Sequence, residues 1–264
     1  MFQSSFFKRL KDRSQQIDSM LCVGLDPHEA DLDEYSAAGA EQFCMQIIIE
    51  THELAAAYKI NSAFFEVFSG DGWFAMERIV KKLKQLNVPV IIDCKRGDIG
   101  TTAEAYAKAM FKTVGADCVT VNPYMGFESI EPFLKFGDIF VLCKTSNTGS
   151  EDFQTLKVNN ESEALFERIA KVFCKAGLED RLGLVVGATD VAAINCIRSK
   201  FPGYWILAPG IGAQGGDLQA AMKSAGETGN ILFPISRGIT SGKQYRENAS
   251  RFRNAMNSAK RLTP

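Results

Sequence analysis

The sequence has little of what several kinds of functional site require. It contains only two histidines, His28 and His52, and its seven cysteines include no C-x-x-C pair. With so few histidines, the sequence argues against a histidine-based metal site or a Ser-His-Asp triad. The cysteines are odd in number, scattered and mostly within apolar runs, which indicates reduced thiols rather than a disulfide or zinc framework. We expect no metal site and a cytoplasmic location.

Long apolar runs and an excess of one charge are also missing. No stretch approaches the ~20 apolar residues of a membrane span, and the first residues lack the apolar core of a signal peptide. Lys and Arg number 30 against 31 Asp and Glu, for a formal net charge of -1. A chain without a basic face is a poor partner for nucleic acid or anionic lipid. A small molecule is the expected ligand.

The chain does have a regular alternation of short apolar runs and segments with helical spacing. Strand-helix alternation repeated eight times is typical of a closed (β/α)8 barrel of the TIM type, and 264 residues fit one such α/β domain spanning residues 1–264. Because periodicity cannot show closure, a doubly wound open sheet is the alternative. The predicted strands are 20–25, 56–60, 88–92, 118–121, 139–143, 183–186, 205–207 and 231–235, and the clearest predicted helices are 40–54, 73–86, 102–114, 161–176 and 190–200.

The most informative segment is Asp93-Cys94-Lys95-Arg96-Gly97-Asp98, which follows the apolar run 88–92. In strand geometry Asp93 and Lys95 point to the same side, while Asp98 lies in the following loop. An arbitrary D-x-K of this kind is usually an ion pair in a solvated turn. After a strand buried on both faces, however, the pair enters a poorly solvated place, which favours a functional site.

Polar residues follow most of the other predicted strands as well, and in barrels the carboxyl ends of the strands form the active site. The last two strands are followed by the glycine-rich stretch 209–217 and by Arg237. Backbone N–H groups in such a turn and an arginine on the next strand together predict a phosphate site. Gly210-x-Gly212-x-x-Gly215 also matches a dinucleotide fingerprint, but no acidic residue follows at the spacing needed for a ribose.

The polar segment 146–162 is longer than most connections between a strand and a helix in this architecture. It is either a lid over the ligand or a plain surface excursion.

Five segments resemble the orotidine 5'-phosphate decarboxylase family, in particular a bacterial subgroup, across nearly the whole chain. They are G-L-D-P at 24–27, K-I-N-S-A-F-F-E at 59–66, D-C-K-R-G-D-I at 93–99, P-G-I-G-A-Q-G-G-D at 209–217 and S-R-G-I at 236–239. The resemblance implies a homodimeric barrel that converts orotidine 5'-monophosphate to UMP and carbon dioxide without metal or organic cofactor. It implies Lys59, Asp93, Lys95 and Asp98 as catalytic residues, and Asp26, Asn61, Thr102, Ser146, Pro209, Gln214 and Arg237 as substrate-binding residues.

The resemblance also implies individual roles. Lys59, Asp93 and Lys95 form an alternating charged array, and Asp98 with Thr102 reaches the partner subunit's site. Asp26 and Lys59 bind ribose hydroxyls, Ser146 contacts the pyrimidine, and Gln214 and Arg237 hold the phosphate.

The charged residues suit this chemistry. Loss of carbon dioxide from the pyrimidine leaves a localised carbanion at C6, which an ammonium at Lys95 can stabilise and then protonate. Flanking carboxylates keep a buried lysine charged. Two alternatives remain: a metal-dependent or Schiff-base sugar-phosphate lyase or aldolase on the same barrel, and a non-catalytic barrel that binds a phosphorylated ligand.

Overall fold

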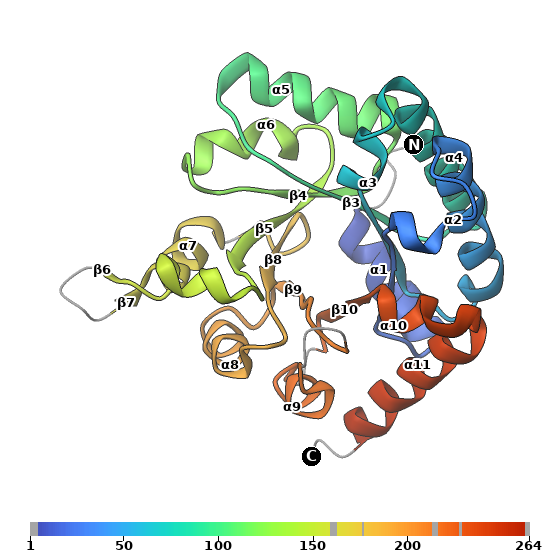
Figure 1. The fold of residues 1–264 in the computed structure, drawn as a ribbon. Coiled ribbons are helices and arrows are strands. Elements are labelled where there is room, and N and C mark those ends of the chain that lie inside the picture. Colours follow the sequence, from blue (N-terminus) through green and yellow to red (C-terminus); the bar gives the residue numbers. More distant parts are fainter. Residues whose placement is uncertain (1–4, 159–162, 176, 213–215, 227–228, 262–264) are drawn as a thin grey trace.

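A closed barrel of parallel strands forms the centre of the molecule (Figure 1). The structure is a computed structural model that describes residues 5–158, 163–175, 177–212, 216–226 and 229–261. Closure rests on β1, which pairs in parallel with both β2 and β10, so the barrel is confirmed and the open-sheet alternative is wrong. The order around the barrel is β1-β10-β9-β8-β5-β4-β3-β2. The strands are β1 (Leu21–Leu25), β2 (Ala57–Asn61), β3 (Val90–Arg96), β4 (Cys118–Val121), β5 (Asp138–Lys144), β8 (Leu182–Val186), β9 (Trp205–Leu207) and β10 (Ile231–Ile235).

Helices surround the barrel and follow the strands in sequence (Figure 1). Among the described residues, no helix is both long and apolar enough to cross a membrane. The longer covering helices are α2 (Ala37–Thr51), α4 (Ser69–Gln85), α5 (Gly100–Lys108), which continues into the π-helix η2 (Ala109–Val114), α7 (Leu165–Phe173), α8 (Val191–Lys200), α9 (Leu218–Lys223) and α11 (Tyr245–Arg261); α3 (Ala63–Glu66), α6 (Glu131–Leu134) and α10 (Arg237–Thr240) are single turns.

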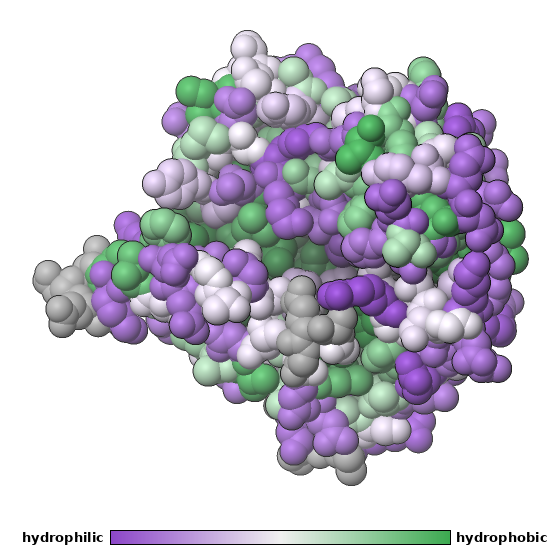
Figure 2. Space-filling model, in the orientation of Figure 1, coloured by the Kyte–Doolittle hydropathy of each residue, from purple (hydrophilic) through white to green (hydrophobic). Residues whose placement is uncertain are grey.

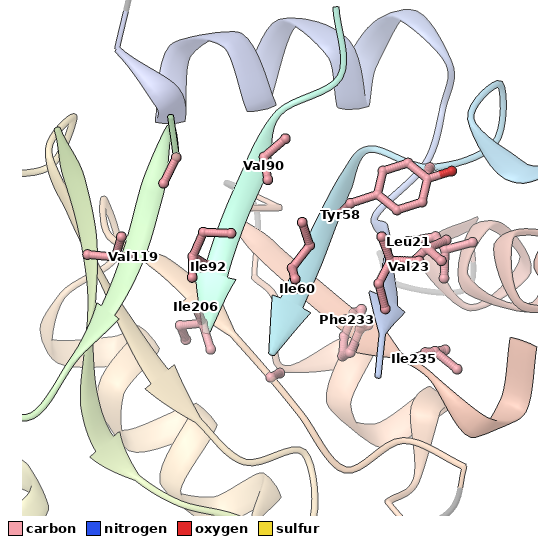
Figure 3. Packing of buried hydrophobic residues seen from close by; sticks show 14 of the residues in the cluster. Leu21, Val23, Tyr58, Ile60, Val90, Ile92, Val119, Ile206, Phe233 and Ile235 are labelled. Atoms are coloured by element: carbon pink, nitrogen blue, oxygen red, sulfur yellow. The ribbon is translucent and has the colours of Figure 1, made fainter. Parts of the chain in front are cut away.

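The alternation of side chains along each strand divides the apolar residues into an outer and an inner layer. Leu21 and Val23 on β1, like Tyr58 and Ile60 on β2, pack in the outer layer between the strands and the helices (Figure 3). The Tyr58 hydroxyl lies 2.6 Å from the Thr51 hydroxyl of α2. Because the period of a strand is two, the intervening residues point into the barrel.

The helix that precedes β1 closes the amino-terminal end of the barrel. α1 (Phe6–Gln16) buries Phe6, Phe7 and Leu10 in the inner cluster, where the Phe7 ring centroid lies 5.2 Å from that of Phe140. The Phe6 N–H donates to Asp138 at the start of β5, at 2.6 Å. With this end filled by aromatic side chains, the opposite, carboxyl end of the strands is where a ligand can enter.

Two features depart from the prediction based on sequence. β3 runs on to Arg96 instead of ending at residue 92, and its register with β4 shifts between Ile92 and Arg96. In the segment 146–162, the described residues form a 3-10 turn at Thr148–Asp152 and β6 (Lys157–Val158), which makes a short antiparallel pair with β7 (Glu163–Ala164). This pair projects away from the barrel (Figure 1).

Candidate active site

A compact group of charged side chains lies at the carboxyl ends of β2 and β3. Lys59 Nζ lies 3.0 Å from Asp93 Oδ2 and 3.7 Å from Asp26 Oδ1. Lys95 Nζ lies 2.7 Å from Asp93 Oδ1. The prediction that Asp93 and Lys95 point to the same side is therefore confirmed, and the Asp93 carboxylate bridges the two ammonium groups.

Burial makes the ion pair between Lys59 and Asp93 stronger than a surface pair. The side chains of Lys59 and Asp93 are 10% and 11% exposed, whereas that of Lys95 is 49% exposed. Burial by itself disfavours both charges, but the opposite charges outweigh it. Lys59 and Lys95 hold the pKa of Asp93 well below its ordinary value, and Asp93 and Asp26 hold the pKa of Lys59 above its ordinary value. Both groups are therefore charged at neutral pH.

The backbone of Lys95 has an unusual conformation. Its φ is 45°, in the left-handed region that residues with a side chain rarely adopt, and it lies within the register shift of β3. The Thr120 hydroxyl of β4 accepts a hydrogen bond from the Lys95 N–H at 3.0 Å and donates one to Asp93 Oδ1 at 2.8 Å. A bulge thus turns the lysine toward the open end of the barrel.

The charged group forms one wall of a cavity of about 450 Å³, visible as the hollow at the centre of Figure 2. Hydrophobic residues form its floor and hydrophilic residues stand along much of its rim. This volume suits a small organic ligand with one polar and one apolar side. The cavity is lined by Gly24, Asp26, Lys59, Asp93, Lys95, Thr120, Leu142, Thr145, Ser146, Asn147, Val185, Leu207, Pro209, Gly210, Ile211, Pro234, Ser236, Arg237 and Gly238.

Most of the predicted site residues line this cavity, but not all. Asn61, Asp98 and Thr102 are not among the lining residues. Asp98 accepts a hydrogen bond from the Ile99 N–H, and Thr102 is exposed on α5. Gln214 lies outside the described residues. Lining the cavity as predicted are Asp26, Lys59, Asp93, Lys95, Ser146, Pro209 and Arg237.

Lys144, at the end of β5, holds the loop that carries Ser146. Its side chain is 5% exposed, and its ammonium donates to the Ser150 hydroxyl at 2.6 Å and lies 3.7 Å from Asp190 Oδ2. On the far side of Ser146, an added Cβ on Gly187 would come within 2.8 Å of the serine Cα. The loop base is therefore fixed from two sides, and a side chain at position 187 would displace the serine.

The glycine-rich stretch after β9 differs in detail from the prediction. Gly210 lines the cavity with a φ of 112°. The first free amides of α9, however, donate hydrogen bonds to the helix's own N-cap, because Asp217 Oδ1 accepts from the N–H groups of Gln219 and Ala220. The start of α9 is thus already capped, and Arg237, just after β10, is a further cationic residue among the described residues that line the cavity.

Two polar atoms at the cavity have no hydrogen-bond partner among the described residues. They are Asp26 Oδ1 and the Ser236 hydroxyl oxygen, and both are buried. Buried polar groups without partners are rare in folded proteins. A ligand with hydroxyl groups would satisfy them. Within the described part of the chain, no group of three or more His, Cys, Asp or Glu side chains is placed to hold a metal ion.

Comparison with known proteins places this geometry in a family. The model of the orotidine 5'-phosphate decarboxylase / HUMPS family matches residues 19–252. An orotidine 5'-phosphate decarboxylase of Roseiflexus castenholzii is 42% identical over 97% of this chain and 99% of its own, and one of Haloarcula marismortui is 45% identical over 89% and 86%. The solved OMP decarboxylase of Leishmania donovani superposes with a TM-score of 0.88 at 38% identity, covering 98% of this chain and 99% of its own. The chain therefore belongs to the orotidine 5'-phosphate decarboxylase / HUMPS family.

Proposed function

We propose that this chain converts orotidine 5'-monophosphate to UMP and carbon dioxide, with Lys95 as carbanion stabiliser and proton donor. The observation that carries the proposal is the bridge from Lys59 through Asp93 to Lys95 at the edge of the cavity. The family and the named relatives support the same reaction. No observation favours a sugar-phosphate lyase, an aldolase or a non-catalytic binding barrel. The whole chain, residues 1–264, is proposed to act as one domain in the cytoplasm.

The chemical step places two demands on the site. When the bond between C6 and the carboxylate carbon breaks, its electron pair stays on C6 and carbon dioxide leaves. The Lys95 ammonium lowers the energy of that carbanion and then transfers one proton from Nζ to C6, which yields UMP. Asp93 directs the lysine side chain, because its carboxylate accepts a hydrogen bond from Lys95 Nζ at 2.7 Å. The step needs neither metal nor organic cofactor.

The remainder of the cavity suits the rest of the substrate. Asp26 and Lys59 are proposed to bind ribose hydroxyls, which would give Asp26 Oδ1 the hydrogen bond that it lacks among the described residues. Arg237 is proposed to bind the phosphate bidentately. Ser146 is proposed to contact the pyrimidine. Binding energy at the remote phosphate can lower the barrier at C6, so Arg237 contributes to turnover as well as affinity.

The remaining substrate contacts are proposed from the sequence segments that resemble the family. Asn61 and Pro209 are proposed to complete the ribose and pyrimidine contacts, and Gln214 to assist Arg237 at the phosphate.

A homodimer with shared sites is proposed because two of the predicted site residues do not line the cavity of their own chain. These residues are Asp98 and Thr102. Large apolar side chains stand exposed beside them: Ile99 is 54% exposed, and Tyr124 in the neighbouring loop after β4 is 92% exposed. Such side chains suit burial against another protein surface. A second copy would cover them and bring its Asp98 to the partner cavity.

Mixed dimers test this sharing. Asp98→Ala and Lys95→Ala subunits are each expected to be nearly inactive alone. Mixed, they are expected to recover activity, because a hybrid dimer has one site with neither substitution. No recovery, with subunit exchange proven by labelled chains, would contradict the sharing.

The proposed reaction is tested by following the ultraviolet absorbance of the orotate ring. Orotidine 5'-monophosphate is added to the purified chain in excess EDTA, with Lys95→Ala in parallel. The chromophore is expected to disappear with wild type only. An unchanged spectrum with folded wild type, together with borohydride trapping of a ketose phosphate on Lys59 or Lys95, would favour the aldolase instead.

A further inference from the structure

One buried hydroxyl connects the two residues that carry the proposed chemistry. Thr120 is 1% exposed on β4, and its side chain lines the cavity. A hydroxyl can donate one hydrogen bond and accept two. Thr120 donates to Asp93 Oδ1 at 2.8 Å and accepts from the Lys95 N–H at 3.0 Å. A single side chain thus holds both the carboxylate and the lysine backbone.

The lysine backbone needs such a contact. With a φ of 45° Lys95 occupies a conformation that a lysine does not favour, and the register shift removes it from the regular ladder between β3 and β4. Residues in strained conformations persist only when their surroundings hold them. Without the Thr120 hydroxyl, the Lys95 N–H loses its described partner and the bulge can relax toward extended backbone.

The carboxylate is fixed by the same atom. Asp93 Oδ2 faces Lys59, whereas Oδ1 accepts from both Lys95 Nζ and the Thr120 hydroxyl. Threonine is branched at Cβ, which restricts its χ1 and therefore the direction of its hydroxyl. Thr120 thus orients the Asp93 carboxylate plane so that one oxygen faces each lysine.

We propose that Thr120 is a positioning residue for decarboxylation: its hydroxyl fixes the Lys95 bulge and the Asp93 carboxylate together, so that Lys95 Nζ is directed at the substrate carbon. This inference rests on the proposed function. Thr120 donates no proton to the substrate and binds no part of it in this account. It acts on the chemical step through Lys95, so it affects turnover more than substrate affinity.

Two variants separate the hydroxyl from the shape of the side chain. Thr120→Val keeps the shape and removes the hydroxyl, and Thr120→Ser keeps the hydroxyl. A shift of about 1 Å in a catalytic group can cost on the order of 100-fold in rate. We expect Thr120→Val to lower kcat by about 10- to 100-fold with KM within about 3-fold of wild type, and Thr120→Ser to retain kcat within about 3-fold.

Thr51→Val is the matched control, because Thr51 is also a fully buried threonine with two hydrogen bonds, to the Ile47 carbonyl and the Tyr58 hydroxyl. It lies in the outer layer, away from the cavity. We expect this variant to lower the urea midpoint of unfolding but to leave kcat within about 2-fold of wild type, since it removes a buried hydrogen bond outside the site.

A second readout follows proton transfer alone. The final step in reverse removes a proton from C6 of UMP, so UMP incubated with the enzyme in D2O exchanges its C6 hydrogen. Proton NMR measures the rate of this exchange. Thr120→Val is expected to slow exchange by a factor similar to its loss in kcat, whereas a purely structural weakening would leave exchange per folded molecule unchanged.

The outcomes separate the two proposals. If wild type decarboxylates the substrate and Thr120→Val matches it in kcat and in C6 exchange, the positioning role is wrong and the proposed function stands. Equal losses in Thr120→Val and Thr120→Ser would also overturn it, because the hydroxyl would not be the cause. An inactive, folded wild type would overturn the proposed function and this inference with it.

Discussion

The Asp93→Asn substitution tests whether one carboxylate holds the two lysines of the site together. The change keeps the size of the side chain and removes its charge. At an effective dielectric constant of ~20, the pair at 3.0 Å between Lys59 and Asp93 contributes about 5.5 kcal/mol before desolvation. Asp26 remains 3.7 Å from Lys59 and compensates part of this loss. The pair with the half-exposed Lys95 adds only about 0.2–1 kcal/mol.

We therefore expect Asp93→Asn to lower the free energy of unfolding by about 3 kcal/mol, near the lower end of the range for breaking a buried pair. Urea unfolding at pH 7 and fixed protein concentration measures it. The matched control is Asp117→Asn, since the Asp117 side chain is 5% exposed and pairs with Arg9 at 2.9 Å, at the opposite end of the barrel. Both variants are expected to lose stability, but only Asp93→Asn is expected to lose turnover per folded molecule.

The pH dependence gives an independent check. The pKa of Asp93 is lower in the folded protein than its ordinary value, so the carboxylate stabilises the fold above about pH 4, and this contribution is lost as the pH falls through the folded pKa. The pKa of Lys59 is raised, so its contribution is lost only in strong alkali. The difference between wild type and Asp93→Asn is expected to be constant from about pH 5 to 8 and to shrink in acid. An Asp93→Asn protein as stable as wild type at pH 7 would refute the reasoning.

Three further variants test the phosphate contact, the closed end of the barrel and the loop after β5. Arg237→Ala is expected to lower kcat/KM for orotidine 5'-monophosphate by about 10- to 100-fold and to leave turnover of the nucleoside orotidine almost unchanged, because only the former has a phosphate; equal losses on both would contradict a phosphate contact. Phe7→Ala is expected to lower the free energy of unfolding by about 3–5 kcal/mol, measured by urea unfolding, since it removes a buried ring; a loss under 1 kcal/mol would show that α1 contributes little. Lys144→Met is expected to speed proteolytic cleavage within 148–156, because Ser150 loses its buried partner; cleavage at the wild-type rate would count against this anchor.

The eight strands could be predicted because each contains a short apolar run that is buried. The strand pattern alone could not show that the barrel closes, because closure depends on the pairing of β1 with β10, which are more than 200 residues apart in the sequence. The β6 and β7 strands were missed because two residues in each are too few to form a pattern. The bulge of β3 was missed because nothing in a lysine favours a positive φ; the tertiary contact with Thr120 provides it.

The charged residues of the site could be predicted because charge directly after a buried strand is unusual. The lining residues within the strands were missed, since Thr120, Leu142, Val185 and Leu207 look like ordinary core in the sequence. Their position in the strand period contained the signal. Side chains two positions apart in a strand point to the same side. In each strand, every second residue therefore points into the barrel, as Lys59 does in β2, and such residues were candidates for lining the cavity. Asp98 and Thr102 remain predictions that depend on a second copy of the chain.

The most direct test of the central claim is the product formed in D2O. Wild type and Lys95→Ala are incubated with orotidine 5'-monophosphate, and proton NMR of the UMP is combined with measurement of released carbon dioxide. We expect wild type to release one carbon dioxide for each UMP and to place one deuterium at C6, and Lys95→Ala to do neither. A Lys95→Ala protein that still forms UMP at a tenth of the wild-type rate would contradict the role of Lys95 as carbanion stabiliser and proton donor.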